Sequence, residues 1–156
     1  MAGGDTIVAL SSGALPSGVA VIRLSGPKSG PVLDALCGLR PEPRRFALRS
    51  LKAAGETIDH GLVAWMPGPQ SFTGEDCAEL HVHGSAAVVR ALLRHLTTTQ
   101  GLRLAEAGEF TRRAFLNGKL DLTEVEGLGD LLSAETEAQR RQAVARAAGG
   151  LSRQID

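Results

Sequence analysis

The chain of 156 residues has few aromatic side chains and no excess of either charge. It contains four phenylalanines, one tryptophan and no tyrosine, which argues against a stacking platform for single-stranded nucleic acid. Its 17 basic residues are balanced by 17 acidic ones, so the basic footprint of a protein that binds nucleic acid by itself is missing. One local cluster of basic residues consists of Arg40, Arg44, Arg45, Arg49 and Lys52. The favoured interpretation of this cluster is a solvated linker and strand edge.

Cysteine is equally scarce, and long apolar runs are absent. Cys37 and Cys77 are too few for a disulfide framework and lack CxxC spacing, so both are expected to be small buried apolar side chains. No run of roughly 18 apolar residues occurs, and the first residues lack the basic and apolar regions of a secretory signal. These features predict a cytoplasmic protein that does not enter a membrane.

Motifs that cradle nucleotide phosphates are also missing. Gly118-Lys119 is followed by Leu120 rather than Ser or Thr, and Arg113 stands where a P-loop needs its first glycine. Gly127-Leu128-Gly129 lacks the third glycine of a dinucleotide-binding turn. Nucleophile-elbow and zinc-protease motifs do not occur either. We therefore assign no catalytic residue and expect no GTPase activity from this chain alone.

Hydrophobic periodicity predicts an α+β fold with a mixed sheet packed with helices. Strands are expected at residues 6–10, 19–24, 58–66 and 77–83, with partial alternation at 46–51 and a short return to the sheet at 102–104. Helices are expected at 30–36, after a cap at Ser85, and at 108–117, with Phe110, Ala114 and Phe115 facing inward in the last. The order mixes local hairpins with crossovers, which favours a mixed sheet.

The character of the sequence changes at Thr123. Thr123 and Glu126 have the spacing of a capping box, and a helical apolar stripe continues through Val125, Leu128, Leu131 and Leu132. A helix of this length needs a surface to pack on. We therefore predict one domain over residues 1–122, followed over 123–156 by a long helix that opens a second, helical domain and is cut off before its pattern ends.

Two charged side chains interrupt the strand pattern. Arg23 shares its predicted strand face with Val19 and Val21, an unusual place for a guanidinium unless a carboxylate meets it. Glu79 is an acid in the middle of an otherwise regular strand. An internal Arg23–Glu79 ion pair and a ligand site are equally good interpretations of these two residues.

Two histidines and one loop complete the polar candidates. His81 and His83 point to the same strand face, where a metal pair is geometrically possible, but polar side chains lining a pocket or interface are favoured because no third ligand beyond Glu79 supports a metal. The polar loop 69–76 carries one exposed aromatic residue, Phe72; it is either a binding loop or a plain connection.

Taken together, several segments resemble the N-terminal region of the TrmE/MnmE family of tRNA-modification GTPases. They occur in order along nearly the whole chain: residues 5–10 (DTIVAL), 21–26 (VIRLSG), 71–76 (SFTGED), 79–84 (ELHVHG), 108–122 (GEFTRRAFLNGKLDL) and 151–155 (LSRQI). The third and fifth strings are long and specific. One departure is the turn Ser12–Gly18, which lacks the arginine of the Gly-Arg-Gly-Gly stretch usual in the family.

The resemblance implies a domain similar to tetrahydrofolate-binding domains that forms a homodimer. It implies that a reduced folate, 5-formyl- or 5,10-methylene-tetrahydrofolate, binds near the dimer interface as a one-carbon donor. The folate contacts of the family fall on Arg23, Glu79 and Lys119 of this sequence. A carboxylate at Glu79 suits the two adjacent N–H donors of a pterin ring. A purely structural dimerisation module without ligand is the alternative function.

The resemblance also implies the activity of the longer proteins. With a partner flavoprotein, such proteins install a carboxymethylaminomethyl or related group at C5 of the wobble uridine of certain tRNAs. Their GTPase domain, which uses GTP, Mg²⁺ and K⁺, is inserted in the helical domain, and its motifs are absent from this sequence.

Overall fold

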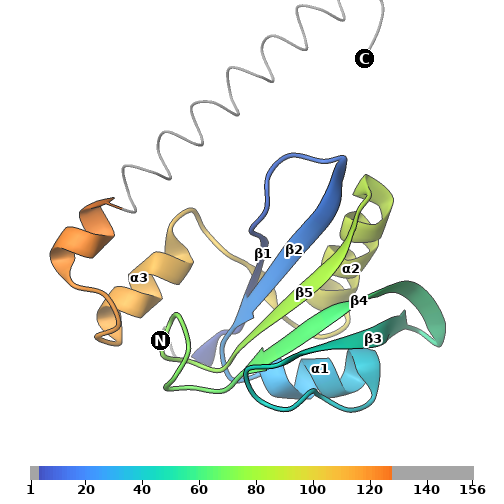
Figure 1. The fold of residues 1–156 in the computed structure, drawn as a ribbon, viewed down its shortest axis with the longest axis horizontal. Helices are drawn as coiled ribbons and strands as arrows, with labels where there is room; N and C mark the ends of the chain where they lie inside the picture. Colours follow the sequence, from blue (N-terminus) through green and yellow to red (C-terminus); the bar gives the residue numbers. More distant parts are fainter. Residues whose placement is uncertain (1–3, 128–156) are drawn as a thin grey trace, which may run out of the picture.

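The structure, a computed structural model, describes residues 4–127. They form a six-stranded sheet in the order β3-β4-β5-β2-β1-β6, accompanied by helices α1, α2 and α3 (Figure 1). The elements, in chain order, are β1 (Ile7–Leu10), β2 (Ser17–Ser25), α1 (Ser29–Cys37), β3 (Phe46–Ala53), β4 (Glu56–Met66), β5 (Cys77–Gly84), α2 (Ala86–Thr98), β6 (Arg103–Leu104) and α3 (Glu109–Leu116).

Strand pairing confirms the predicted α+β fold with a mixed sheet. The pairs β3–β4, β4–β5, β5–β2 and β2–β1 are antiparallel, whereas β6 runs parallel to β1. Every predicted strand and helix of this region is present, with ends shifted by a few residues. The alternation at 46–51 is a full strand, β3, because it pairs along its whole length with β4.

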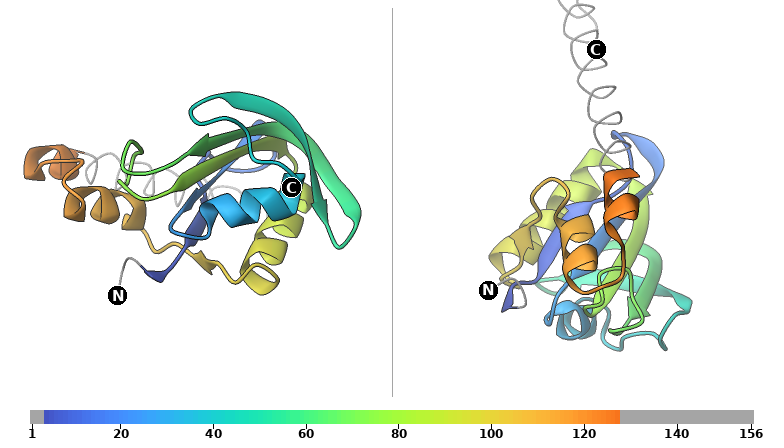
Figure 2. Two further views of the ribbon diagram at one scale, coloured as in Figure 1. Left: turned by 90° about the horizontal axis from the view of Figure 1, so that it is seen from below. Right: turned by 90° about the vertical axis from the view of Figure 1, so that its left-hand side faces the viewer.

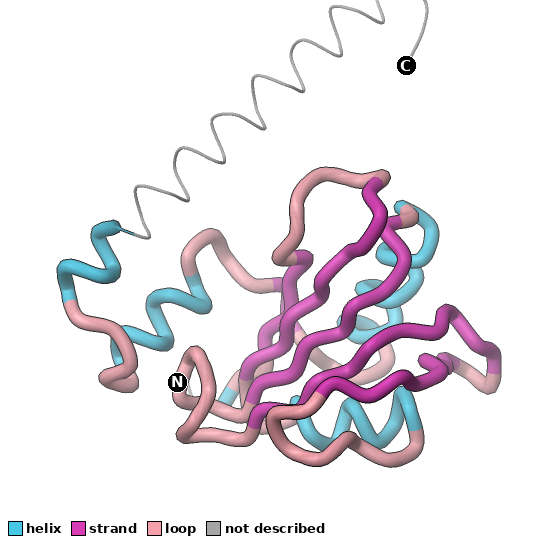
Figure 3. The backbone as a smooth tube through the Cα atoms, viewed as in Figure 1, coloured by secondary structure: helices cyan, strands magenta, loops and turns pink. Residues whose placement is uncertain are grey.

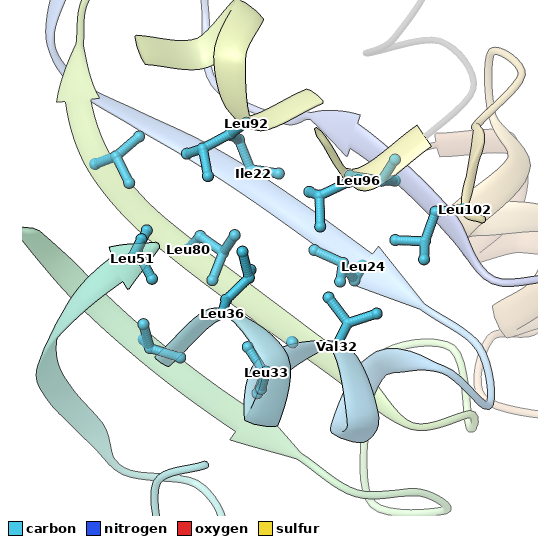
Figure 4. Packing of buried hydrophobic residues seen from close by; sticks show 14 of the residues in the cluster. Ile22, Leu24, Val32, Leu33, Leu36, Leu51, Leu80, Leu92, Leu96 and Leu102 are labelled. Atoms are coloured by element: carbon cyan, nitrogen blue, oxygen red, sulfur yellow. The ribbon is translucent and has the colours of Figure 1, made fainter. Parts of the chain in front are cut away.

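Helices α1 and α2 both cover one face of the curved sheet, and the core lies between them and the strands (Figure 2). Alternate strand residues such as Ile22, Leu24 and Leu80 are fully buried beneath the helices (Figure 4). The buried residues of α2 recur at helical spacing: Val89, Leu92 and Leu96. Its predicted N-cap is confirmed, since the Ser85 side chain accepts a hydrogen bond from the Val88 N–H.

The opposite face of strands β3, β4, β5 and β2 has no described helix over it, and we call it the open face. Strand register places on it the charged residues Arg23, Glu79 and His81. The same face exposes four large apolar side chains, namely Val19 (56 % exposed), Phe46 (55 %), Leu48 (69 %) and Leu62 (43 %). Exposed apolar side chains gathered on one face indicate a binding or association surface.

Helix α3 lies beside the end of the sheet rather than on either face (Figures 1 and 3). The predicted inward residue Ala114 is fully buried, but Phe115 is 40 % exposed, so that part of the prediction was wrong. The other buried residues of α3 are the charged Glu109 and Arg113. Helical periodicity of apolar residues could not reveal a helix that packs through an ion pair.

The next helical segment, residues 122–127, begins two residues earlier than a cap at Thr123 predicts. Its capping box is formed by Asp121, whose carboxylate accepts from the Glu124 N–H at 2.7 Å, and by Glu124, whose carboxylate accepts from the Asp121 N–H at 3.0 Å. The predicted Thr123–Glu126 box is thus wrong, because Asp and Glu at the same spacing satisfy the same amides. The continuation of this helix and most of the predicted second domain lie outside the described residues.

Two smaller expectations concern cysteine and membranes. Cys77 is buried as predicted, whereas Cys37 is half-buried, and burial raises the pKa of its thiol although the nearby Arg49 lowers it. Within the described part of the chain, none of the helices combines the length and apolar character that a membrane crossing requires.

The lowered pKa of Glu109 predicts that the folded state loses stability at acid pH. Hydrogen bonds from Arg103 lower the pKa of Glu109 from 4.5 to about 2 against the opposing effect of burial. The stabilisation from this carboxylate should therefore be complete above about pH 4.5 and disappear as the pH falls towards 2. Because Arg103 is 43 % exposed and screened by solvent, about 3 kcal/mol is an upper bound for the loss.

The measurement is the free energy of unfolding by urea between pH 2.5 and 7. Glu109→Gln should remove part of the fall in stability at acid pH, while Glu106→Gln, three residues away and exposed, should leave it unchanged. Equal pH dependence in wild type and Glu109→Gln would show that Glu109 does not make this contribution.

Candidate functional site

An ion pair between Arg23 and Glu79 forms the centre of the open face. The two residues stand directly opposite each other in the antiparallel register of β2 and β5. Arg23 donates from Nε at 3.2 Å and from Nη2 at 3.0 Å, both to Oε2 of Glu79. Their side chains are 32 % and 17 % exposed. The internal ion pair considered for the sequence is therefore present, and it remains accessible to a ligand.

His81 contacts the second oxygen of Glu79. Its Nε2 lies 2.9 Å from Glu79 Oε1, and its ring meets the edge of Phe46 with centroids 4.8 Å apart. Burial by itself would raise the pKa of Glu79, but the His81 hydrogen bond and the charge and hydrogen bonds of Arg23 outweigh it. The pKa of Glu79 therefore lies below its ordinary value, and the carboxylate is ionised at neutral pH.

The loop between β4 and β5, residues 67–76, folds over one end of the open face. Its Thr73 is buried against Ser25 and Cys77, with 2.7 Å between the Thr73 and Ser25 hydroxyl oxygens. One residue earlier, the ring of Phe72 lies 5.7 Å from the guanidinium carbon of Arg23 and is 40 % exposed. The loop thus adds an accessible aromatic ring to the charged cluster.

Lys119 lies against the same loop, at Gly74. It is exposed, and its Cε lies 3.4 Å from the position that a Cβ on Gly74 would occupy. Gly74 has φ +83°, a conformation that L side chains rarely adopt, so glycine suits this position both conformationally and sterically. Of the three predicted site residues, Arg23 and Glu79 are therefore in direct contact, while Lys119 adjoins the loop whose Phe72 covers Arg23.

The two histidines on the open face have separate partners. His83 pairs with Asp59 through Nδ1 at 2.8 Å and through its backbone N–H at 2.9 Å, whereas His81 pairs with Glu79. Among residues 4–127, no group of three or more His, Cys, Asp or Glu side chains is arranged to hold a metal ion.

Two grooves with volumes of about 690 and 500 Å³ lie elsewhere, along the two sides of α2. Both include Arg90 and Arg94 in their walls. Because α2 covers the other face of the sheet, these grooves are separated from Arg23 and Glu79 by the sheet itself. The charged cluster is thus part of neither groove.

Sequence reasoning missed the polar contacts that attach the loop to α3. Arg113 donates to Glu75 Oε1 at 3.0 Å, and the Ser25 hydroxyl donates to the same oxygen at 2.7 Å. The one available signal was the four-residue spacing of Glu109 and Arg113, typical of an ion pair within a helix. Nothing in the sequence indicated that Glu75, 38 residues away, would join them.

An α+β domain with a charged and apolar open sheet face is typical of modules that bind a ligand or a second chain on that face. A family model described as "GTP-binding protein TrmE N-terminus" matches residues 6–119. The match covers most of the chain, and the chain belongs to this family. The resemblance inferred from the sequence motifs is confirmed.

Curated relatives include proteins named "tRNA modification GTPase MnmE". The chain is 62 % identical over 149 residues to the protein of Rhizobium meliloti (strain 1021), an alignment that covers 95 % of this chain and 34 % of the relative. It is 56 % identical over 154 residues to that of Novosphingobium aromaticivorans, covering 97 % of this chain and 35 % of the relative. The chain thus spans about a third of the length of these relatives.

The contact between His81 and Glu79 predicts that removing the His81 side chain changes the pKa of Glu79. His81→Ala removes a hydrogen bond and a charge that lower the pKa of Glu79, so this pKa should rise. Carboxyl-carbon NMR across a pH titration measures it directly. His83→Ala is the matched control, because His83 lies two residues along the same strand and pairs with Asp59 instead. An unchanged Glu79 pKa in His81→Ala would contradict the assigned contact.

Proposed function

We propose that this chain is the folate-binding and dimer-forming N-terminal domain of a tRNA-modification GTPase. The observation that carries the proposal is the accessible Arg23–Glu79–His81 cluster on the open face of a domain that belongs to the TrmE family. The ligand is a reduced folate, 5-formyl- or 5,10-methylene-tetrahydrofolate, and the fold is of the tetrahydrofolate-binding-domain type.

Glu79 has the chemistry needed to recognise a pterin. The aminopyrimidine edge of the ring presents two adjacent N–H donors, which an ionised carboxylate accepts in parallel. A carboxylate has about four lone-pair sites, two on each oxygen. Arg23 donates two bonds to Oε2 and His81 contacts Oε1, so Oε1 keeps one free site. A parallel pair of pterin hydrogen bonds therefore requires Arg23 to give up one of its two bonds to Oε2. These neighbours also keep the group ionised, which strengthens the bonds that it accepts.

The cations and the aromatic ring around Glu79 suit the remaining parts of a folate. Arg23 and Lys119 are positive groups that can meet the ring carbonyl, a formyl oxygen or the carboxylates of the glutamate tail. Phe72, beside Arg23, offers a flat apolar surface for the pterin or benzoyl ring. The site therefore combines the polar and apolar contacts that this class of ligand requires.

A second copy of the chain is the occupant that we assign to the open face. Val19, Phe46, Leu48 and Leu62 expose apolar surface around the charged cluster. A partner covering them would remove that surface from water and enclose the bound folate close to the interface. The same association would lower the dielectric constant around Glu79 and strengthen its hydrogen bonds to the ligand.

In the longer protein, the folate carried here supplies one carbon for modification at C5 of the wobble uridine of tRNA. The reaction also requires a partner flavoprotein and a GTPase domain that binds GTP with Mg²⁺ and K⁺, and it takes place in the cytoplasm. The names of the relatives, which specify tRNA modification and a GTPase, support this assignment. The role of this chain is to bind the one-carbon donor and to pair two copies of the protein.

Titration with 5-formyl-tetrahydrofolate tests the ligand. Glu79→Ala removes charge-assisted bonds worth about 1.5–3 kcal/mol each, which corresponds to at least about tenfold weaker binding. Glu79→Gln should also bind poorly, because its amide sets a donor against a donor of the pterin. Lys119→Ala should weaken binding with little change in melting temperature, since the residue is exposed.

Glu56→Ala and Lys52→Ala are matched controls for this titration. Both residues are exposed and lie on the β3–β4 hairpin, and their substitution should leave the folate affinity unchanged. If wild type shows no saturable binding, the chain is a structural dimerisation module instead. Unchanged affinity in all three site variants, with wild type binding, would remove the site assignment alone.

The oligomeric state tests the role of the open face. Leu48→Asp and Leu62→Asp place a carboxylate in the proposed interface, where its desolvation should weaken the dimer by at least about tenfold. Sedimentation velocity at micromolar concentration measures this shift. Leu39→Asp is the control, since Leu39 is 71 % exposed but follows α1 on the helix-covered side. A wild-type monomer, or an undisturbed dimer in both variants, would contradict the proposed interface.

A further inference from the structure

The guanidinium of Arg113 is buried where α3 meets the rest of the domain. The residue is 2 % exposed. Its Nη1 donates to the Asp5 carbonyl at 2.9 Å and to Glu75 Oε1 at 3.0 Å, while Nη2 donates to Glu109 Oε2 at 3.3 Å. Among the described residues, Nε has no hydrogen-bond partner. One buried cation thus connects the N-terminal strand region, the loop and the helix.

Stability alone is a weak reason for such an arrangement. Removing a guanidinium and a carboxylate from water carries a large desolvation cost, and apolar side chains of similar volume often stabilise as well or better. A buried ion pair is directional, however, because fixed donors must meet fixed acceptors. It therefore defines one position of α3 relative to the loop, whereas an apolar contact would permit sliding.

Glu75 connects Arg113 of α3 to the loop and to β2. Its Oε1, which accepts from Arg113, also accepts from the Ser25 hydroxyl at 2.7 Å. The Ser25 and Thr73 hydroxyl oxygens lie 2.7 Å apart, and the Thr73 carbonyl accepts from Asn117 Nδ2 at 2.7 Å. Both ends of the segment 73–75 are therefore held from two sides: by Ser25 of β2, and by Arg113 of α3 and the Asn117 that caps it.

The same segment separates the residues assigned to the folate site. Phe72 precedes it and lies against Arg23, while Gly74 lies within it and faces Lys119. The Lys119 backbone N–H donates to the Ala114 carbonyl at 2.8 Å, so Lys119 is anchored to the turn of α3 that carries Arg113. A displacement of α3 from the loop would therefore move Lys119 away from Gly74.

From these contacts we propose that Arg113 and Glu75 are positioning residues for the folate site. Their ion pair places Lys119 at a fixed position beside the loop, next to Gly74. Neither residue needs to touch the ligand. The functional part of this inference rests on the proposed folate binding, but the placement of Lys119 by the ion pair can be tested without any ligand.

The ligand-free test is the proximity of Lys119 to Gly74 in the 156-residue chain. Nuclear Overhauser contacts between the Lys119 ε-methylene and the Gly74 α-protons should be present in wild type. They should be lost in Glu75→Ala and reduced in Glu75→Gln, which keeps an acceptor oxygen but loses the charge. Arg112→Ala should retain them, because Arg112 is the neighbour of Arg113 on α3 and is 56 % exposed. Contacts that persist in Glu75→Ala would overturn the proposal.

The functional test is a double-mutant cycle on affinity for 5-formyl-tetrahydrofolate. Glu75→Ala should weaken binding by about five- to tenfold, but by less than about twofold when Lys119 is already alanine, because residues that act through one another are non-additive. Equal losses in both backgrounds, or a lower melting temperature with unchanged affinity, would overturn the positioning role.

A failure of the proposed folate binding can be distinguished from a failure of the positioning role. If wild type does not bind the folate, the assignment of folate as ligand is wrong, and the nuclear Overhauser measurement alone then decides whether the ion pair positions Lys119. Arg113→Lys supplies a second variant that keeps the charge: a folded protein with partly restored proximity supports positioning by the ion pair, and complete loss of proximity in a folded protein contradicts charge as its basis.

Discussion

The antiparallel pairing of β2 with β5 is the constraint on which the remaining features depend. It places Ile22 beside Leu80 on the helix-covered face and Arg23 opposite Glu79 on the open face. Because side chains alternate along a strand, a register shift of one residue would exchange the faces and bury the ion pair among leucines. The hydrophobic core therefore fixes the pairing of Arg23 and Glu79, and a charged site is obtained without local strain at either residue.

Helix α3 is attached to the rest of the domain mainly through buried ion pairs and hydrogen bonds. Glu109 and Arg113 are buried, whereas Phe115 and Leu116 of the same helix are 40 % and 64 % exposed. The loop 67–76 is held between the sheet and this helix. Its Thr73 contacts Ser25 of β2 and accepts a hydrogen bond from Asn117 at the end of α3, and its Glu75 pairs with Arg113. The open sheet face, the loop and the C-terminal end of α3 thus adjoin one another through named polar contacts.

Much of the architecture followed from local patterns. Alternation located the strands, and the Ser85 cap located the start of α2. Errors arose where several residues could satisfy the same backbone groups or where a helix packed through charge. Asp121 took the capping role predicted for Thr123, since both supply an oxygen at the required spacing. Phe115 was predicted to be inward because apolar periodicity assumes an apolar interface.

By itself, the sequence determined the fold class, the family and the presence of an acid and a base in the strands, because these depend on periodicity and on motifs that can be read along the chain. Only the tertiary structure decided that Arg23 contacts Glu79, that His81 shares the same carboxylate, and that Glu75 meets Arg113. Each of these contacts joins residues through strand register or through the fold of a loop. Such pairings depend on which distant segments become neighbours, and that information appears only when the whole sheet has assembled.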